Sequence, residues 1–126
     1  MKLTRRPVFL DLTKLRFPIG AITSILHRVA GVVLTMALPL LVLALERSVA
    51  NEASYQSLFQ LAQSPWTLPV LALTCWALCH HLLAGVRHLL MDAGLGSSLK
   101  VARRTALVAL VGGAFLALLL FVRVLS

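Results

Sequence analysis

Three long runs of apolar residues, separated by short polar stretches, dominate the chain. They lie at about residues 18–45, 66–90 and 105–125. Because an α-helix rises about 1.5 Å per residue, each run is long enough to cross the roughly 30 Å hydrocarbon core of a bilayer. The pattern predicts an all-α integral membrane protein with three transmembrane helices. We expect a single domain, residues 1–126, in which residues 1–17 form an arm before the first span.

The first run carries polar residues into the membrane. Its unbroken apolar part, residues 29–45, spans only about 25 Å as a helix, so the crossing helix must also include the residues before it. The polar and small residues in the first half of the run recur at spacings of three and four and share one helix face: Ser24, His27, Arg28, Gly31 and Thr35. We expect a face of this kind to be turned away from lipid.

Arg28 has two interpretations. Its side chain could extend along the helix to the headgroups, as isolated arginines near a helix end do. Alternatively, its guanidinium and the Ser24 hydroxyl, one turn apart, could bind the carboxylate of a buried cofactor or the carbonyl of a lipid-soluble quinone. The shared polar face favours the second interpretation.

The second run presents two imidazoles separated by a glycine on one face. His81 and His88 fall within about 20° of one another around the helix axis, and Gly85 lies within about 60° of both. A flat macrocycle needs such a gap, because its edge must lie close to helix backbone while an imidazole nitrogen reaches the iron. We therefore predict that His81 is a haem ligand. His80 points about 100° away and is the weaker candidate.

A haem held by His81 needs a second ligand from elsewhere. His88 lies on the same helix face and would approach the iron from the same side as His81, so it cannot be that ligand. His27 lies at a depth comparable with that of His81, which leaves an intrachain pair geometrically possible.

The remaining polar residues of the second and third runs favour structural interpretations. Arg87 and Asp92, at the end of the second run, are expected to form a solvated ion pair, although a haem propionate or a partner subunit is a second possibility for Arg87. In the third run, Ala109, Gly113 and Ala117 form a stripe of small residues suited to close helix packing.

Charge and composition set the orientation and exclude other classes of protein. The net charge is +8, charged residues make up 13% of the chain and mean hydropathy is +0.93. Most Lys and Arg residues flank the apolar runs on one side, without interleaved aromatics, so we exclude nucleic-acid binding. The positive-inside rule places the N-terminus in the cytoplasm and the C-terminus in the periplasm. No secretory signal is evident, and the two cysteines, Cys75 and Cys79, lie too close on one helix for a disulfide framework.

Two segments resemble a known family. RPVFLDLTKLRFPIGAITSILHRVAG, residues 6–31, and HLLAGVRHLLMD, residues 81–92, resemble the cytochrome b (b556-type) anchor subunits of bacterial succinate dehydrogenase. The resemblance covers the arm and the first two helices, whereas the third helix agrees only in length.

The resemblance implies a multi-pass subunit of the bacterial inner membrane that has no catalytic residues of its own. It would share haem b with a second anchor subunit, which supplies the other iron ligand and makes the intrachain His27 pair less probable. It would also bind ubiquinone and take electrons from an iron–sulfur subunit. Succinate would be oxidised in a flavoprotein subunit, so FAD and iron–sulfur clusters are expected only in partner subunits.

The resemblance also implies roles for individual residues. His81 would be the axial haem ligand, and residues of the propionate side and haem pocket would be His27, Arg28, Gly85 and His88. Quinone would be bound by Ser24 and Arg28, with an apolar wall of Leu12, Phe17 and Ile25. Two alternatives remain open: a fumarate reductase-type anchor that uses menaquinol, and a haem-free scaffold or transporter subunit whose histidines and arginines form an ion path.

Overall fold

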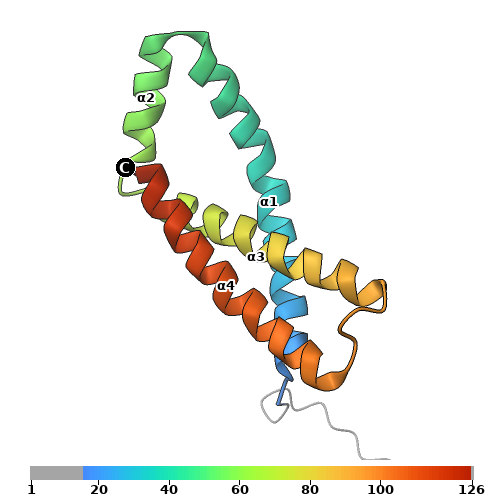
Figure 1. Ribbon diagram of the computed structural model, residues 1–126. Helices are drawn as coiled ribbons and strands as arrows, with labels where there is room; N and C mark the ends of the chain where they lie inside the picture. Colours follow the sequence, from blue (N-terminus) through green and yellow to red (C-terminus); the bar gives the residue numbers. More distant parts are fainter. Residues whose placement is uncertain (1–15, 126) are drawn as a thin grey trace, which may run out of the picture.

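The structure, a computed structural model, describes residues 16–125 and contains four helices in that range (Figure 1). They are α1 (Ile19–Ala50), α2 (Glu52–Ala62), α3 (Leu68–Asp92) and α4 (Leu99–Leu125). Three of them, α1, α3 and α4, are long and apolar enough to cross a membrane, which confirms the predicted spans. Leu12, one of the expected quinone-wall residues, lies outside the described residues.

The helix boundaries differ from the predicted runs. α1 continues to Ala50, past the charged Glu46 and Arg47, and α4 begins at Leu99 rather than near residue 105. Charged residues near a span's ends lie beyond the hydrocarbon core, where they do not interrupt a helix. The 32 residues of α1 extend about 48 Å at 1.5 Å per residue, so this helix is longer than the bilayer core is thick.

α2 was not predicted. It is a short helix of 11 residues between the first two spans, and the Asn51 side chain caps it by accepting a hydrogen bond of 2.8 Å from the Ser54 amide. The rings of Tyr55 and Phe59 stack with centroids 6.5 Å apart, one turn from each other. Figure 1 shows α2 folding back from the top of α1 toward the start of α3.

The core lies between α3 and α4, and small residues form most of it. On α4 the buried residues are Ala106, Ala109, Gly113 and Ala117, which extends the predicted stripe by one turn. On α3 they are Cys75, Ala77, His80, Ala84 and Arg87. Small side chains allow the two backbones to approach closely, so that dispersion and weak polar contacts hold the pair together.

Gly113 is the closest of these contacts. A Cβ atom added there would lie 3.1 Å from the Cα atom of His80, and a backbone atom cannot move aside as a side-chain tip can. We expect Gly113→Val to destabilise the α3–α4 pair by about 1–3 kcal/mol. Thermal unfolding of the purified protein in detergent measures this loss. Val111→Leu, at an exposed position two residues away, is the matched control and should change little.

α1 joins this pair only through its first half. Its buried residues are Thr23 and Ala30, and the Thr23 hydroxyl lies 3.4 Å from the carbonyl oxygen of Ala106 on α4. The second half of α1 diverges from α3 and α4 (Figure 1) and leaves a hollow of about 770 Å³ bounded by α1, α2 and the start of α3. Most of the large apolar residues of this half are exposed.

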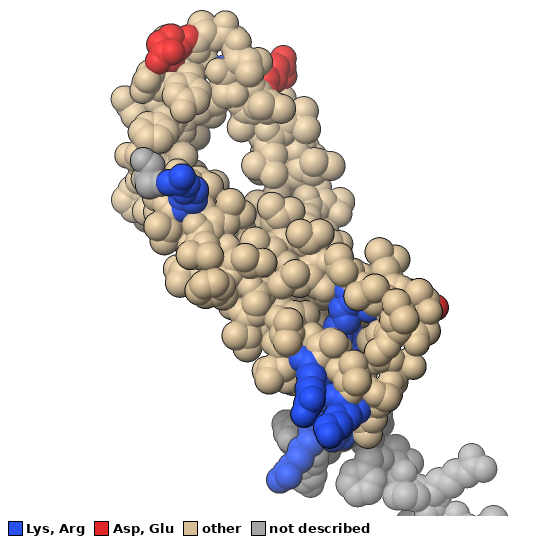
Figure 2. All heavy atoms as spheres, viewed as in Figure 1, with Lys and Arg blue, Asp and Glu red and all other residues tan. Residues whose placement is uncertain are grey.

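Charges gather at opposite ends of the molecule. Figure 2 shows most of the visible Lys and Arg side chains grouped at the end where α1 begins and α3 connects to α4, and acidic side chains at the other end, around the α1–α2 turn, with isolated charges elsewhere on this face. The α3–α4 connection contains two glycines in the left-handed region, Gly94 with φ +81° and Gly96 with φ +74°. Glycine adopts these angles without steric cost, which allows the chain to reverse within a short loop.

Candidate functional site

Three histidines from two helices meet between α1 and α3. The rings of His27 and His81 are stacked with centroids 4.1 Å apart and planes 15° from parallel. His88 lies about two turns further along α3, and its ring centroid is 5.0 Å from that of His27. The sequence predicted that His81 and His88 share a face of α3, and the structure brings His27 of α1 onto that face.

The His81 ring is oriented by backbone. Its Nδ1 atom lies 3.1 Å from the carbonyl oxygen of His27. A carbonyl only accepts hydrogen bonds, so Nδ1 must carry the proton, and the other ring nitrogen, Nε2, then holds the lone pair of the neutral imidazole. Metal-binding histidines in proteins are typically oriented in this manner, by a hydrogen bond from the nitrogen that does not bind the metal.

Two glycines make room for the stacked rings. A Cβ atom at Gly31 would lie 3.1 Å from Cε1 of His81, and a Cβ atom at Gly85 would lie 3.4 Å from Nε2 of His27. Each helix thus carries a histidine and, four residues later, a glycine that faces the histidine of the other helix. The space at Gly85 receives the His27 ring, whereas the helical spacing had predicted a macrocycle edge there.

An open groove runs along the histidines. It has a volume of about 480 Å³ and is lined by His27, Arg28, Gly31, Val32, Thr35, Met36 and His81. Four of the five residues of the predicted polar face of α1 therefore line it, the exception being Ser24. The Nε2 atom of His27 is buried and has no hydrogen-bond partner within residues 16–125. Such an atom is costly in a membrane interior, which indicates that a further group belongs at this site.

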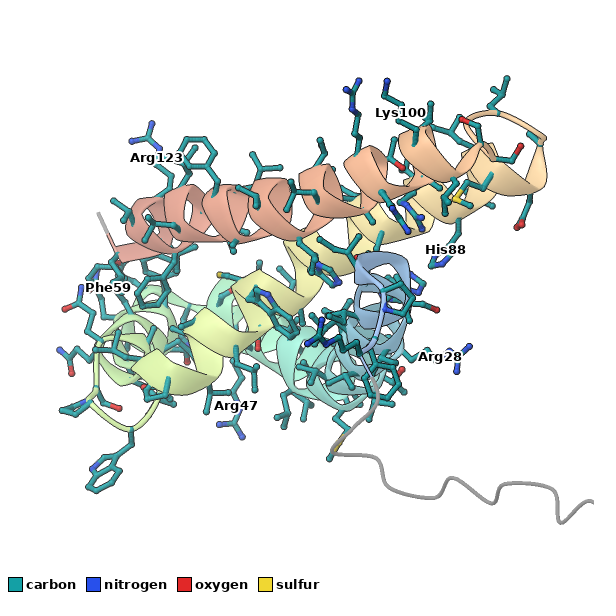
Figure 3. All side chains as sticks on the ribbon, turned by 90° about the horizontal axis from the view of Figure 1, so that it is seen from below. Arg28, Arg47, Phe59, His88, Lys100 and Arg123 are labelled. Atoms are coloured by element: carbon teal, nitrogen blue, oxygen red, sulfur yellow. The ribbon has the colours of Figure 1, made fainter. Side chains whose placement is uncertain are left out.

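The predicted quinone-binding residues lie at the open, basic end of α1. Ser24 is half-buried and Arg28 is exposed, and within the described part of the chain neither side chain has a hydrogen bond or ion pair. Figure 3 shows Arg28 projecting outward from α1 on the side from which His88 projects from α3. Phe17 and Ile25 are about half exposed. The polar face of α1 is thus divided: His27 and Gly31 pack against α3, whereas Arg28 projects away from this chain's own helices.

His80 faces a different direction from His81. It is fully buried, its ring stacks on Trp76 with centroids 5.5 Å apart, and its backbone contacts Gly113 of α4. Both ring nitrogens lack hydrogen-bond partners within the described residues. The 100° separation expected from the sequence is present, and it places His80 in the α3–α4 contact, away from the groove.

The expected ion pair of Arg87 with Asp92 is wrong. Arg87 is 9% exposed, and its Nε atom donates to the Thr105 hydroxyl at 3.2 Å, while Nη2 donates to the carbonyl oxygen of Ala102 at 3.1 Å. Its partners belong to α4, because Arg87 lies on the same α3 face as His80 and Ala84. Arg87 is also absent from the residues that line the histidine groove.

Comparison with known proteins identifies the family of this chain. Residues 2–121 match the family described as "Succinate dehydrogenase/Fumarate reductase transmembrane subunit". The chain belongs to this family. Because the match reaches residue 121, it includes the third span, which the sequence analysis had related to the family only by its length.

Relatives in the succinate dehydrogenase/fumarate reductase transmembrane subunit family align over most of the chain. The chain is 42% identical over 103 residues to the succinate dehydrogenase cytochrome b556 subunit of Coxiella burnetii, covering 81% of this chain and 82% of the relative. It is 33% identical over 114 residues to the corresponding subunit of Paracoccus denitrificans, and the alignment covers 90% of this chain and 88% of the relative. It is 34% identical over 118 residues to the corresponding subunit of Rickettsia conorii, and the alignment covers 94% of this chain and 92% of the relative. These relatives are subunits of an oxidoreductase complex, which confirms the family predicted from the two segments.

Proposed function

We propose that this protein is a membrane anchor subunit of succinate dehydrogenase that holds one side of a b-type haem and part of a ubiquinone site. The observation that carries the proposal is the orientation of His81. Its Nδ1 atom is bound to the His27 carbonyl, 3.1 Å away, which leaves Nε2 available on a residue that lines the groove. The names of the relatives, cytochrome b556 subunits, support a b-type haem as the group that this chain helps to hold.

The residues around His81 fit a haem. Iron would take the Nε2 atom of His81, and the group would supply a centre that accepts and releases single electrons. His27 and Arg28 line the same groove and offer a hydrogen-bonding atom and a positive charge for propionate carboxylates. His88, whose ring is next to that of His27, belongs to the same pocket.

The second iron ligand comes from another subunit. The rings of His27 and His81 are stacked face to face with centroids 4.1 Å apart, so a macrocycle would not fit between them and His27 would not serve as the second ligand. A second anchor subunit that covers the exposed polar face of α1 would supply the opposing histidine. It would also bury many of the apolar side chains that the first half of α1 leaves exposed.

Ubiquinone would bind beside Ser24 and Arg28, at the basic end of the molecule. A quinone head needs hydrogen-bond donors within an otherwise apolar cleft, and these two side chains have no partners within residues 16–125. Phe17 and Ile25 are exposed nearby on the same helix end and would form part of the apolar wall. The iron–sulfur subunit would then deliver electrons from this side.

Charge determines the proposed orientation. The cluster of Lys and Arg residues at the start of α1 and at the α3–α4 connection (Figure 2) belongs in the cytoplasm by the positive-inside rule. The N-terminus and the haem and quinone groove would therefore face the cytoplasm from the bacterial inner membrane, and the C-terminus would reach the periplasm. On the cytoplasmic side an iron–sulfur subunit and a flavoprotein, which contain the iron–sulfur clusters and FAD, would complete the complex.

Succinate oxidation is favoured over the two alternatives. The family includes both succinate dehydrogenase and fumarate reductase subunits, but the relatives described above, at 33–42% identity, are named as succinate dehydrogenase subunits. An ion path requires neither the Nδ1 hydrogen bond of His81 nor the paired glycines opposite the histidines, so a haem-free transporter does not account for the geometry.

Affinity purification of the tagged chain from its native membrane tests the assembly. We expect a flavoprotein, an iron–sulfur protein and a second small anchor protein to co-purify in equal amounts, with succinate-dependent reduction of a soluble dye. The variant Leu43→Ala, changed at an exposed position on the second half of α1, is a control and should retain all three partners. Recovery of the chain alone, or with transport proteins, would contradict the proposal.

A further inference from the structure

Arg87 is a buried charge without a counterion in the described part of the chain. Its two recorded partners, the Thr105 hydroxyl and the Ala102 carbonyl, are neutral, and within residues 16–125 no carboxylate pairs with it. A guanidinium that is 9% exposed retains its positive charge, so it favours the binding of an anion.

The position of Arg87 differs from that of an arginine that extends to the headgroups. Arg87 lies five residues before the end of α3, about 8 Å inside the helix end. A snorkelling side chain would point along the helix toward water. Instead, the guanidinium bends onto α4, and a Cβ atom added at Gly20 of α1 would lie 3.8 Å from its Nη2 atom. The charge is fixed where α1, α3 and α4 meet.

An apolar groove between α3 and α4 leads to this charge. It has a volume of about 310 Å³ and includes two polar side chains, Arg87 and Thr105. The others are Leu83, Val86, Leu90, Met91, Leu95, Val108 and Ala109, together with Gly96. This groove is distinct from the histidine groove, because the two share no residue.

We propose that this α3–α4 groove binds one anionic phospholipid, with its phosphate on Arg87 and Thr105 and part of an acyl chain along the apolar lining. Charge complementarity selects an anionic lipid, since the first turns of α4 add Lys100, Arg103 and Arg104 at the same end of the molecule (Figure 2). The apolar lining selects a lipid over a free anion. The lipid would join α3 to α4 near the loop that connects them, independently of haem and quinone.

Lipid titration of the purified complex tests the proposal. The complex is delipidated, placed in nanodiscs of phosphatidylcholine with increasing phosphatidylglycerol, and its bound lipids are counted by native mass spectrometry. We expect the wild-type complex to retain one phosphatidylglycerol per anchor subunit. In the Arg87→Gln variant this lipid should bind at least about tenfold more weakly, because its hydrogen bonds to a charged group are lost. Arg47→Gln, at an exposed position near the far end of α1, is the charge-matched control and should retain it.

A second pair of variants leaves Arg87 intact. Val108→Trp fills the groove from a position that is 67% exposed and should also release the lipid, whereas Val111→Trp lies on α4 outside the groove and should not. Equal retention of phosphatidylglycerol by Arg87→Gln and the wild-type complex would overturn the proposal. Displacement of the lipid by inorganic phosphate would also overturn it, because that result indicates a site for a free anion. An unchanged lipid count in Arg87→Gln together with loss of the iron–sulfur subunit would overturn it as well, because that result indicates that Arg87 pairs with a protein carboxylate.

Discussion

Replacing His81 with leucine is expected to lower haem retention in the purified complex by at least about tenfold. Changes to groups that merely orient a metal ligand already cost about 10–100-fold in metal affinity, and the loss of the ligand itself should cost no less. The dithionite-reduced minus oxidised difference spectrum measures the result, with the haem content expressed per flavin. Any residual haem should lose the low-spin b-type spectrum, because one of its two axial ligands is absent.

The neighbouring histidines provide matched controls. His80→Leu removes an imidazole one residue away that is buried against α4 and is absent from the groove lining, so it should keep the b-type band. His27→Leu removes the stacked ring but keeps the backbone carbonyl that orients His81, so the low-spin spectrum should remain. If His80→Leu or His27→Leu abolishes the band while His81→Leu retains it, the assignment of the ligand is wrong.

The three spans were predictable because apolar length alone specifies them. The cost of leaving backbone polar groups unpaired in lipid makes a helix the expected structure for each run. α2 was missed because residues 46–65 combine charged and polar residues with short apolar stretches, and no run there is long enough to span. The signal that could have found it was the capping residue Asn51 three residues before Ser54, followed by an amphipathic segment.

The histidine site was only partly predictable. Helical spacing correctly separated the directions of His80 and His81, because rotation around one helix depends on sequence alone. Which residue of α1 would face His81 depends on how two helices pack, and spacing within one helix does not determine that. A signal was nevertheless present, since both helices carry a histidine followed four residues later by glycine, in residues 27–31 and 81–85. Read together, they indicate two antiparallel helices that each accommodate the other's histidine.

The partners of Arg87 could not be predicted from its separation in sequence from Asp92. Arg87 and Asp92 are five residues apart, so they lie about 140° apart around the helix and do not face each other. The partners of Arg87 are in α4, and Thr105, in the second turn of that helix, gave no sign of this role in the sequence. Long-range contacts of polar side chains depend on how the helices pair, which spacing within one helix does not determine.

Replacing Arg28 with leucine is expected to lower ubiquinone reductase activity by about 10–100-fold while dye-linked succinate oxidation persists. A hydrogen bond from a charged group contributes about 1.5–3 kcal/mol, and 1.4 kcal/mol corresponds to tenfold. Ser24→Ala removes a neutral hydroxyl and should lower the same activity by about 3–10-fold. Assays with a soluble quinone and with a soluble dye on the same preparation separate quinone reduction from succinate oxidation.

Two residues at the far end of α1 offer matched controls. Arg47→Leu and Ser48→Ala make the same chemical changes on the same helix, about 30 Å from Arg28 and Ser24 at 1.5 Å per residue (Figure 3 labels Arg28 and Arg47). Both should keep the ratio of quinone to dye activity. Unchanged quinone kinetics in Arg28→Leu and Ser24→Ala would contradict the quinone assignment, and an equal fall in both activities would indicate a loss of assembly instead. A raised KM for quinone with the dye rate preserved is the expected result, because the Ser24 hydroxyl and the Arg28 guanidinium, which have no partners within residues 16–125, would bind the quinone head and take no part in succinate oxidation.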